Sequence, residues 1–282
     1  MIGLFDSGHG GLTIFRALSE RFPDRKFVYL GDHANVPYGD RSSDEIVGFT
    51  RAGVETLFDQ GCSLVLLACN TATAVAARTL QQDWLPSSGH ESKNILGIIA
   101  PTVEAATQTP WAVTQPQYPQ MYNRDRIAIF GTTRTITTDV YGEEIRKRCP
   151  EAELFQLACP ELAKSIERDV DDALLEEMVA TYVRELVAKL DGAPLHQAIL
   201  GCTHYPLVEH YFAKYLPAHT RILSQPEIVA NSLEFYLGSH PQFLSDDKSD
   251  RAQSLLLTTG VDALPTSDRL ATFKRGLVFH EV

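Results

Sequence analysis

Short apolar runs alternate along the chain with stretches whose apolar residues recur every three or four positions. The runs predict buried strands at Ile2–Phe5, Lys26–Leu30, Leu64–Ala68, Leu96–Ile99, Ile127–Phe130, Leu154–Ala158, Ala198–Leu200 and Arg221–Leu223. Helical spacing is clear at Leu12, Phe15 and Leu18, and again across residues 174–186. Because strands and helices alternate, the sequence predicts an α/β fold with mostly parallel sheets.

The two halves of the chain repeat each other. Residues 2–8 align with 127–133, residues 67–71 with 200–204, and Pro101 with Pro226, at similar separations along the chain. We therefore predict two α/β lobes of related plan, facing each other across a pseudo-twofold axis, with the active site between them.

The repeated pair Cys69 and Cys202 is the strongest chemical signal. Each cysteine follows an apolar strand and precedes a predicted helix, where parallel sheets bind ligands and where a helix N-terminus favours a thiolate. A single cysteine is usually structural, but two at equivalent positions favour function. Two thiols on opposite sides of one molecule could remove a proton from a carbon and return one to the other face, as in racemisation or epimerisation. Asp6, which ends the first predicted strand, and His204, which lies two residues after Cys202, could assist these thiols.

Polar turns at the strand ends indicate an anion site. The glycine-rich turn 6–11 opens a helix, yet it lacks the spacing of a phosphate-binding or dinucleotide-binding loop. Neutral hydrogen-bonding residues, each also able to cap a helix, recur at equivalent places: Asn70, Thr71, Thr132, Thr133, Thr135 and Thr203. We expect them to hold carboxylates together with backbone amides, without an arginine clamp.

Composition and charge argue against nucleic acids and membranes as partners, and against disulfides and metal sites. The 282 residues are 44% hydrophobic and carry a formal charge of −11, which predicts a folded chain without the cationic surface that nucleic acids or anionic membranes need. The five cysteines form no CxxC pair, so we expect neither a disulfide framework nor a metal site. The N-terminus lacks a basic, apolar leader, and reduced thiols are typical of the cytoplasm.

Five motifs together carry a family resemblance. They are Asp6-Ser7-Gly8-x-Gly10-Gly11, Pro37-Tyr38-Gly39, Cys69-Asn70-Thr71-Ala72-Thr73, Gly131-Thr132-x-x-Thr135 and Gly201-Cys202-Thr203-His204-Tyr205-Pro206-Leu207. The chain closely resembles the glutamate racemases of the aspartate/glutamate racemase family over nearly its whole length.

The resemblance implies a cofactor-independent isomerase that interconverts L- and D-glutamate and supplies D-glutamate for bacterial peptidoglycan. Cys69 would take the α-proton of D-glutamate with support from Asp6, and Cys202 that of L-glutamate with support from His204. The substrate would be held by Asp6, Ser7, Tyr38, Gly39, Asn70, Thr71, Thr132, Thr135, Thr203 and His204. The resemblance also implies a discontinuous first lobe, 1–100 plus 225–282, a second lobe at 101–224, and a possible homodimer.

Two other functions stay open at this point. One is racemisation of another amino acid such as aspartate, against which His204 and Thr73 argue. The other is a regulatory binding protein directed at DNA gyrase on the same fold, against which the retention of both cysteines argues. Two segments depart from the family pattern: 161–167 is more polar, which puts its substrate contacts in question, and 109–124 is longer and is interpreted as a surface loop.

Overall fold

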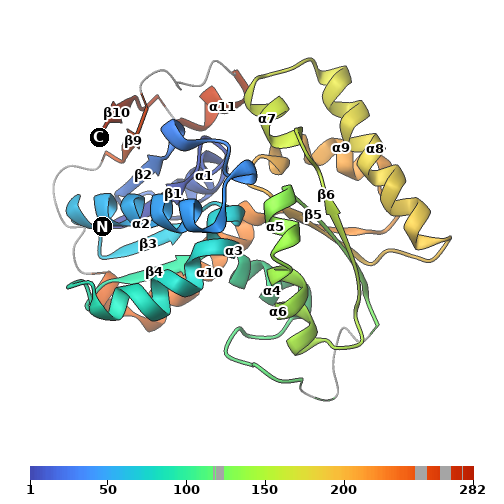
Figure 1. Ribbon diagram of the computed structural model, residues 1–282, viewed down its shortest axis with the longest axis horizontal. Coiled ribbons are helices and arrows are strands. Elements are labelled where there is room, and N and C mark those ends of the chain that lie inside the picture. Colours follow the sequence, from blue (N-terminus) through green and yellow to red (C-terminus); the bar gives the residue numbers. More distant parts are fainter. Residues whose placement is uncertain (117, 119–123, 245–252, 261–267, 275) are drawn as a thin grey trace.

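Two parallel sheets lie side by side in the computed structural model, which describes residues 1–116, 118, 124–244, 253–260, 268–274 and 276–282 (Figure 1). The first sheet contains β1 (Ile2–Asp6), β2 (Phe27–Gly31), β3 (Leu64–Leu67), β4 (Asn94–Gly97), β9 (Leu255–Thr258) and β10 (Phe279–Glu281). The second contains β5 (Arg126–Gly131), β6 (Glu153–Ala158), β7 (Gln197–Gly201) and β8 (Arg221–Leu223). The predicted α/β fold with parallel sheets is confirmed. No helix within the described ranges is long and apolar enough to cross a membrane.

Helices cover both sheets. Around the first sheet are α1 (Leu12–Arg21), α2 (Ser43–Asp59), α3 (Asn70–Thr79), α10 (Gln225–Ser239) and α11 (Asp268–Ala271). Around the second are α4 (Ile99–Thr107), α5 (Thr133–Thr137), α6 (Val140–Arg148), α7 (Leu162–Glu167), α8 (Asp172–Leu190) and α9 (Glu209–Tyr215). The apolar side chains of these helices pack against the adjacent sheet and form the buried core of each lobe with it.

The repeat predicted from the motifs is present in the strand order. The first sheet runs β10-β9-β2-β1-β3-β4 and the second β6-β5-β7-β8, so β2-β1-β3-β4 and β6-β5-β7-β8 share one order. All the pairings are parallel. The turns after β1 and β3 therefore occupy the same places in their lobe as the turns after β5 and β7.

Two equivalent helices cross between the lobes. Helix α4 follows β4 of the first sheet, yet Ile99 and Val103 pack in the core beside Ile127 of the second. Helix α10 follows β8 of the second sheet, yet Val229 and Leu233 pack in the core of the first. This exchange supports a discontinuous first lobe, whose boundaries stay a prediction.

The elements differ from the predicted ones mainly at their ends. The apolar run 96–99 does not form one strand, because β4 ends at Gly97 and α4 begins at Ile99. The helix predicted to follow Cys69 forms as α3, but it ends at Thr79 and the chain continues as a π-helical turn, Leu80–Trp84. Strands β9 and β10 were not predicted, since they are short and β10 buries Phe279 alone.

The segment 109–124 is tethered at its beginning. The Trp111 backbone N–H donates to Glu104 Oε1 at 2.7 Å, and the Arg148 guanidinium lies 4.4 Å from the centre of the Trp111 ring. These contacts join the start of the segment to α4 and α6. Residues 117 and 119–123 lie outside the described residues.

Candidate active site

A cavity of about 530 Å³ lies between the two lobes, at the carboxyl ends of β1, β3, β5 and β7. Of the residues predicted from the sequence, its wall includes Ser7, Tyr38, Gly39, Cys69, Asn70, Thr71, Thr132, Cys202, Thr203 and His204. Asp6 and Thr135 do not line the cavity and lie behind the wall. Within the described ranges, no cluster of His, Cys, Asp or Glu side chains is arranged to hold a metal ion.

Cys69 lies in the first lobe between β3 and α3. Its sulfur accepts a hydrogen bond from the Ala72 backbone N–H at 3.5 Å and lies 3.4 Å from Ser7 Oγ. Burial raises the pKa of the Cys69 thiol to about 12, and the nearby charge of Asp6 adds to this effect. Cys69 is therefore a protonated thiol at neutral pH, in a form that can deliver a proton.

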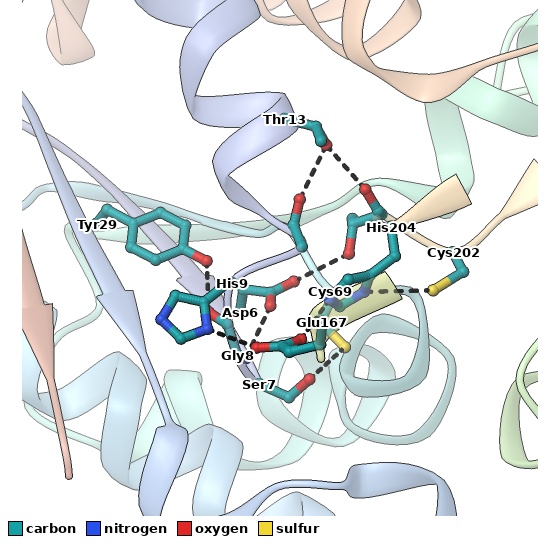
Figure 2. A network of polar contacts seen from close by, with 12 residues as sticks. Asp6, Ser7, Gly8, His9, Thr13, Tyr29, Cys69, Glu167, Cys202 and His204 are labelled. Atoms are coloured by element: carbon teal, nitrogen blue, oxygen red, sulfur yellow. Dashed lines mark hydrogen bonds and ion pairs between the residues drawn. The ribbon is translucent and has the colours of Figure 1, made fainter. Parts of the chain in front are cut away.

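Cys202 lies in the second lobe beside an ion pair. His204 Nδ1 is 3.8 Å from the Cys202 sulfur, and His204 Nε2 hydrogen-bonds Glu167 Oε2 (Figure 2). Burial alone would lower the pKa of His204, but the charge of Glu167 and the contact with Cys202 raise it well above its ordinary value. Burial alone would raise the pKa of Glu167, but its attraction to His204 and its bonds to two histidines lower it. His204 is therefore an imidazolium whose Nδ1–H can donate to the Cys202 sulfur.

Asp6 supports the wall from behind. One carboxylate oxygen accepts from the Gly8 backbone N–H at 2.8 Å, and the other accepts from Thr203 Oγ1 at 3.3 Å. Burial raises the pKa of Asp6, against the opposing effect of His204. Among the described residues, no hydrogen bond joins Asp6 to Cys69, and the charge of Asp6 raises the pKa of that thiol. Asp6 also connects the lobes, because Thr203 belongs to the second.

Three threonine hydroxyls join the lobes across the cavity floor. Thr71 Oγ1 lies 3.0 Å from Thr132 Oγ1 and 3.1 Å from Thr135 Oγ1. Thr132 also caps α5 by accepting from the Thr135 backbone N–H. Both interpretations therefore apply to Thr132, which caps α5 and lines the cavity, whereas Thr71 lines the cavity and Thr135 lies behind its wall.

Asn70 is held by a buried polar network that the sequence did not predict. Its amide nitrogen donates to Gln225 Oε1 at 2.6 Å, and its amide oxygen accepts from Tyr141 OH at 2.7 Å. Gln225 also donates to Thr102 at 2.9 Å. With these bonds the Asn70 side chain has one orientation at the cavity wall.

Tyr38 is also held by a polar network at the cavity wall. Its hydroxyl donates to Asp32 Oδ2 at 2.6 Å, and Asp32 also accepts from Asn35 and from Thr259. The C-terminal part of the chain therefore fixes the loop that carries Tyr38. Burial and the neighbouring Asp32 carboxylate raise the pKa of the Tyr38 phenol, so it remains a donor.

The polar segment 161–167 contributes more than the sequence predicted. Glu167 lines the cavity and bonds both His204 and His9, and Lys164 and Arg168 line it as well. Two cationic side chains therefore line the cavity, while the expectation that the carboxylates are held without an arginine clamp stays a prediction. The polar character of 161–167 was the available signal for Glu167, whereas nothing local distinguished His9 from any other residue in a turn.

The two cysteines are expected to differ in reactivity although each is 6% exposed. A thiol with a pKa of about 12 is thiolate in only about one molecule in 10⁴ at pH 8, whereas Cys202 has an imidazolium 3.8 Å away. Iodoacetamide should therefore label Cys202 faster than Cys69. Mass spectrometry of the two peptides at short reaction times measures this, and equal labelling would contradict the electrostatic difference.

Comparison with known proteins fits this geometry. The family model of Asp/Glu/Hydantoin racemase matches residues 12–232. The chain belongs to this family. It is thus an enzyme of the racemase class, and the family resemblance seen in the motifs is confirmed.

The relatives of this racemase match it over most of its length. A glutamate racemase from Phenylobacterium zucineum is 45% identical over 263 residues, which cover 92% of each chain. The crystal structure of glutamate racemase isoform RacE1 from Bacillus anthracis has a TM-score of 0.80 and 28% identity, covering 100% of this chain and 97% of that one. A glutamate racemase from Francisella tularensis, solved in complex with D-glutamate, has a TM-score of 0.81 at 23% identity, covers 100% of this chain and 96% of that one, and shows the fold.

Proposed function

We propose that this racemase interconverts L- and D-glutamate without a cofactor, using the thiols of Cys69 and Cys202. One observation carries the proposal: two equally buried cysteines, at equivalent strand ends of two lobes, line one cavity. The names of the similar proteins, which are glutamate racemases, support the choice of substrate.

Starting from L-glutamate, the Cys202 thiolate takes the α-proton. The Cα–H bond breaks, an S–H bond forms, and the electron pair stays on Cα. Cys69 then gives its thiol proton to the opposite face, which forms the new Cα–H bond and leaves a Cys69 thiolate. The raised pKa of Cys69 and the imidazolium of His204 both favour the protonation state from which this direction starts. The D-to-L direction is the reverse.

The substrate carboxylates are held mainly by uncharged donors. The proposed contacts on the wall are Ser7, Tyr38, Gly39, Asn70, Thr71, Thr132, Thr203 and His204. Asp6 and Thr135 act from behind, through Thr203 and Thr71. Lys164 and Arg168 add positive charge to the wall, which favours a ligand with two carboxylates in a protein of net charge −11.

The proposal includes a biological role. D-glutamate would enter bacterial peptidoglycan, so the enzyme would serve cell-wall synthesis and cell shape. The described cysteines are all free, in keeping with a cytoplasmic location. The expected oligomeric state is a homodimer.

The activity itself is tested with dialysed protein and either glutamate enantiomer. The circular-dichroism signal of each should decay to zero without added pyridoxal phosphate or metal, and aspartate should react much more slowly. No decay with glutamate, or decay only after a cofactor is added, would refute the proposal. Faster decay with aspartate would assign the other substrate.

A further inference from the structure

One carboxylate is shared by two histidines at the edge of the cavity. Glu167 Oε1 accepts from His9 Nδ1 at 2.5 Å, and Glu167 Oε2 bonds His204 Nε2. Figure 2 shows the resulting row of side chains, from His9 through Glu167 and His204 to Cys202. His9 comes from the turn between β1 and α1 in the first lobe, while the other three residues come from the second.

His9 lines the cavity and is otherwise closely packed. It is 2% exposed, its ring lies against that of His33 with centroids 3.9 Å apart and planes tilted by 33°, and it makes an edge-to-face contact with Phe279 with centroids 5.6 Å apart. Because Glu167 is ionised, the His9 Nδ1 carries the proton in their hydrogen bond. His9 Nε2 is buried and has no hydrogen-bond partner in the part of the chain that the structure describes.

The turn that carries His9 is itself held against the second lobe. The Gly8 carbonyl accepts from Tyr29 OH at 2.7 Å. A Cβ at Gly10 would lie 2.5 Å from both Thr203 Oγ1 and His204 Nδ1, so only glycine permits this approach. The position of His9 relative to His204 is therefore set by backbone packing as well as by Glu167.

We propose that His9 is a positioning residue for proton transfer at Cys202. It holds one oxygen of Glu167, which turns the other toward His204 and keeps the imidazolium Nδ1–H directed at the Cys202 sulfur. His9 itself does not contact that sulfur. The inference rests on the proposed function and adds to it a residue at the open position of the Asp-Ser-Gly-x-Gly-Gly motif.

His9→Leu is expected to lower kcat/KM by about 10- to 100-fold, the range for a buried charge that loses a hydrogen bond. Since the enantiomers have equal free energies, the loss must be equal in both directions and cannot reveal which thiol is affected. Kinetic isotope effects can reveal the affected thiol, because the variant slows only the proton transfer at Cys202. The deuterium kinetic isotope effect on kcat/KM should rise for [2-²H]-L-glutamate, whose α-deuteron Cys202 takes. It should fall for [2-²H]-D-glutamate, whose α-deuteron Cys69 takes.

Two further variants separate the hydrogen bond from packing. His9→Asn places an amide nitrogen as many bonds from Cα as Nδ1, whereas His9→Gln places it at the distance of Nε2. Asn should keep kcat/KM within a few-fold of the parent enzyme, and Gln should behave like Leu. This comparison decides the matter even if His9→Leu does not fold.

Three results would overturn the proposal: parent kcat/KM in His9→Leu, a loss that leaves both isotope effects unchanged, or equal activity of His9→Asn and His9→Gln. Failure of the proposed function is recognised separately, because the parent enzyme would then not racemise glutamate at all.

Discussion

Replacing either Cys69 or Cys202 by serine is expected to lower kcat/KM for both glutamate enantiomers by about 10³- to 10⁴-fold. Each direction uses one thiol as base and the other as acid, so neither direction survives the loss of one sulfur. Serine preserves the shape of the side chain, but its hydroxyl ionises at far higher pH than a thiol. The decay of the circular-dichroism signal, started from each pure enantiomer, measures both directions.

Cys149→Ala provides the matched control. Cys149 is also buried in the second lobe, yet it lies at the end of α6 and does not line the cavity. Its variant should racemise within a few-fold of the parent enzyme. If either serine variant of Cys69 or Cys202 racemised glutamate at the parent rate, the two-thiol mechanism would be wrong.

Glu167→Gln is expected to lower kcat/KM by about 10²-fold or more and to move the alkaline limb of its pH profile to lower pH. The negative charge of Glu167 keeps the pKa of His204 raised, whereas burial opposes it. Glutamine carries no charge, and its single carbonyl oxygen can accept from His204 in place of Oε2. Burial then prevails, the pKa of His204 falls, and the imidazolium is lost as pH rises through this lower value. Profiles of kcat/KM against pH for both proteins measure the shift.

Glu177→Gln controls for the change in net charge. Glu177 lies on α8, is exposed, and pairs with Arg184 at 2.5 Å. Its substitution should leave the pH profile unchanged. An alkaline limb that stays in place in Glu167→Gln would mean that the Glu167 charge does not set the protonation of His204.

The features predicted from the sequence are those with a local signal. The strand before Cys69 and the strand before Cys202 are short apolar runs that end in a polar turn, so both the strands and their place at the sheet edge could be predicted. At 98–99 the same kind of signal misled, because an apolar pair fits a buried helix start as well as a strand.

The parts that escaped prediction depend on residues far apart in the chain. His9 and Glu167 are separated by 158 positions, and no local pattern indicates that the chain brings them within 2.5 Å. The same holds for Gln225, which holds Asn70 from a helix of the other half of the chain. Asp6 was identified from its motif, but its hydrogen bond from Thr203 of the other lobe could not be predicted.

Two separate thiols on opposite faces of one substrate leave a distinct isotope pattern in D₂O. L-glutamate is followed at low conversion, with mass spectrometry of each separated enantiomer. A thiol holds a single proton, so Cys202 can return only the proton it took, while Cys69 delivers a deuteron from solvent. The D-glutamate formed should carry deuterium at Cα, and the remaining L-glutamate should keep protium. D-glutamate formed with protium at Cα would mean that a single base transfers the proton, and the two-thiol mechanism would be wrong.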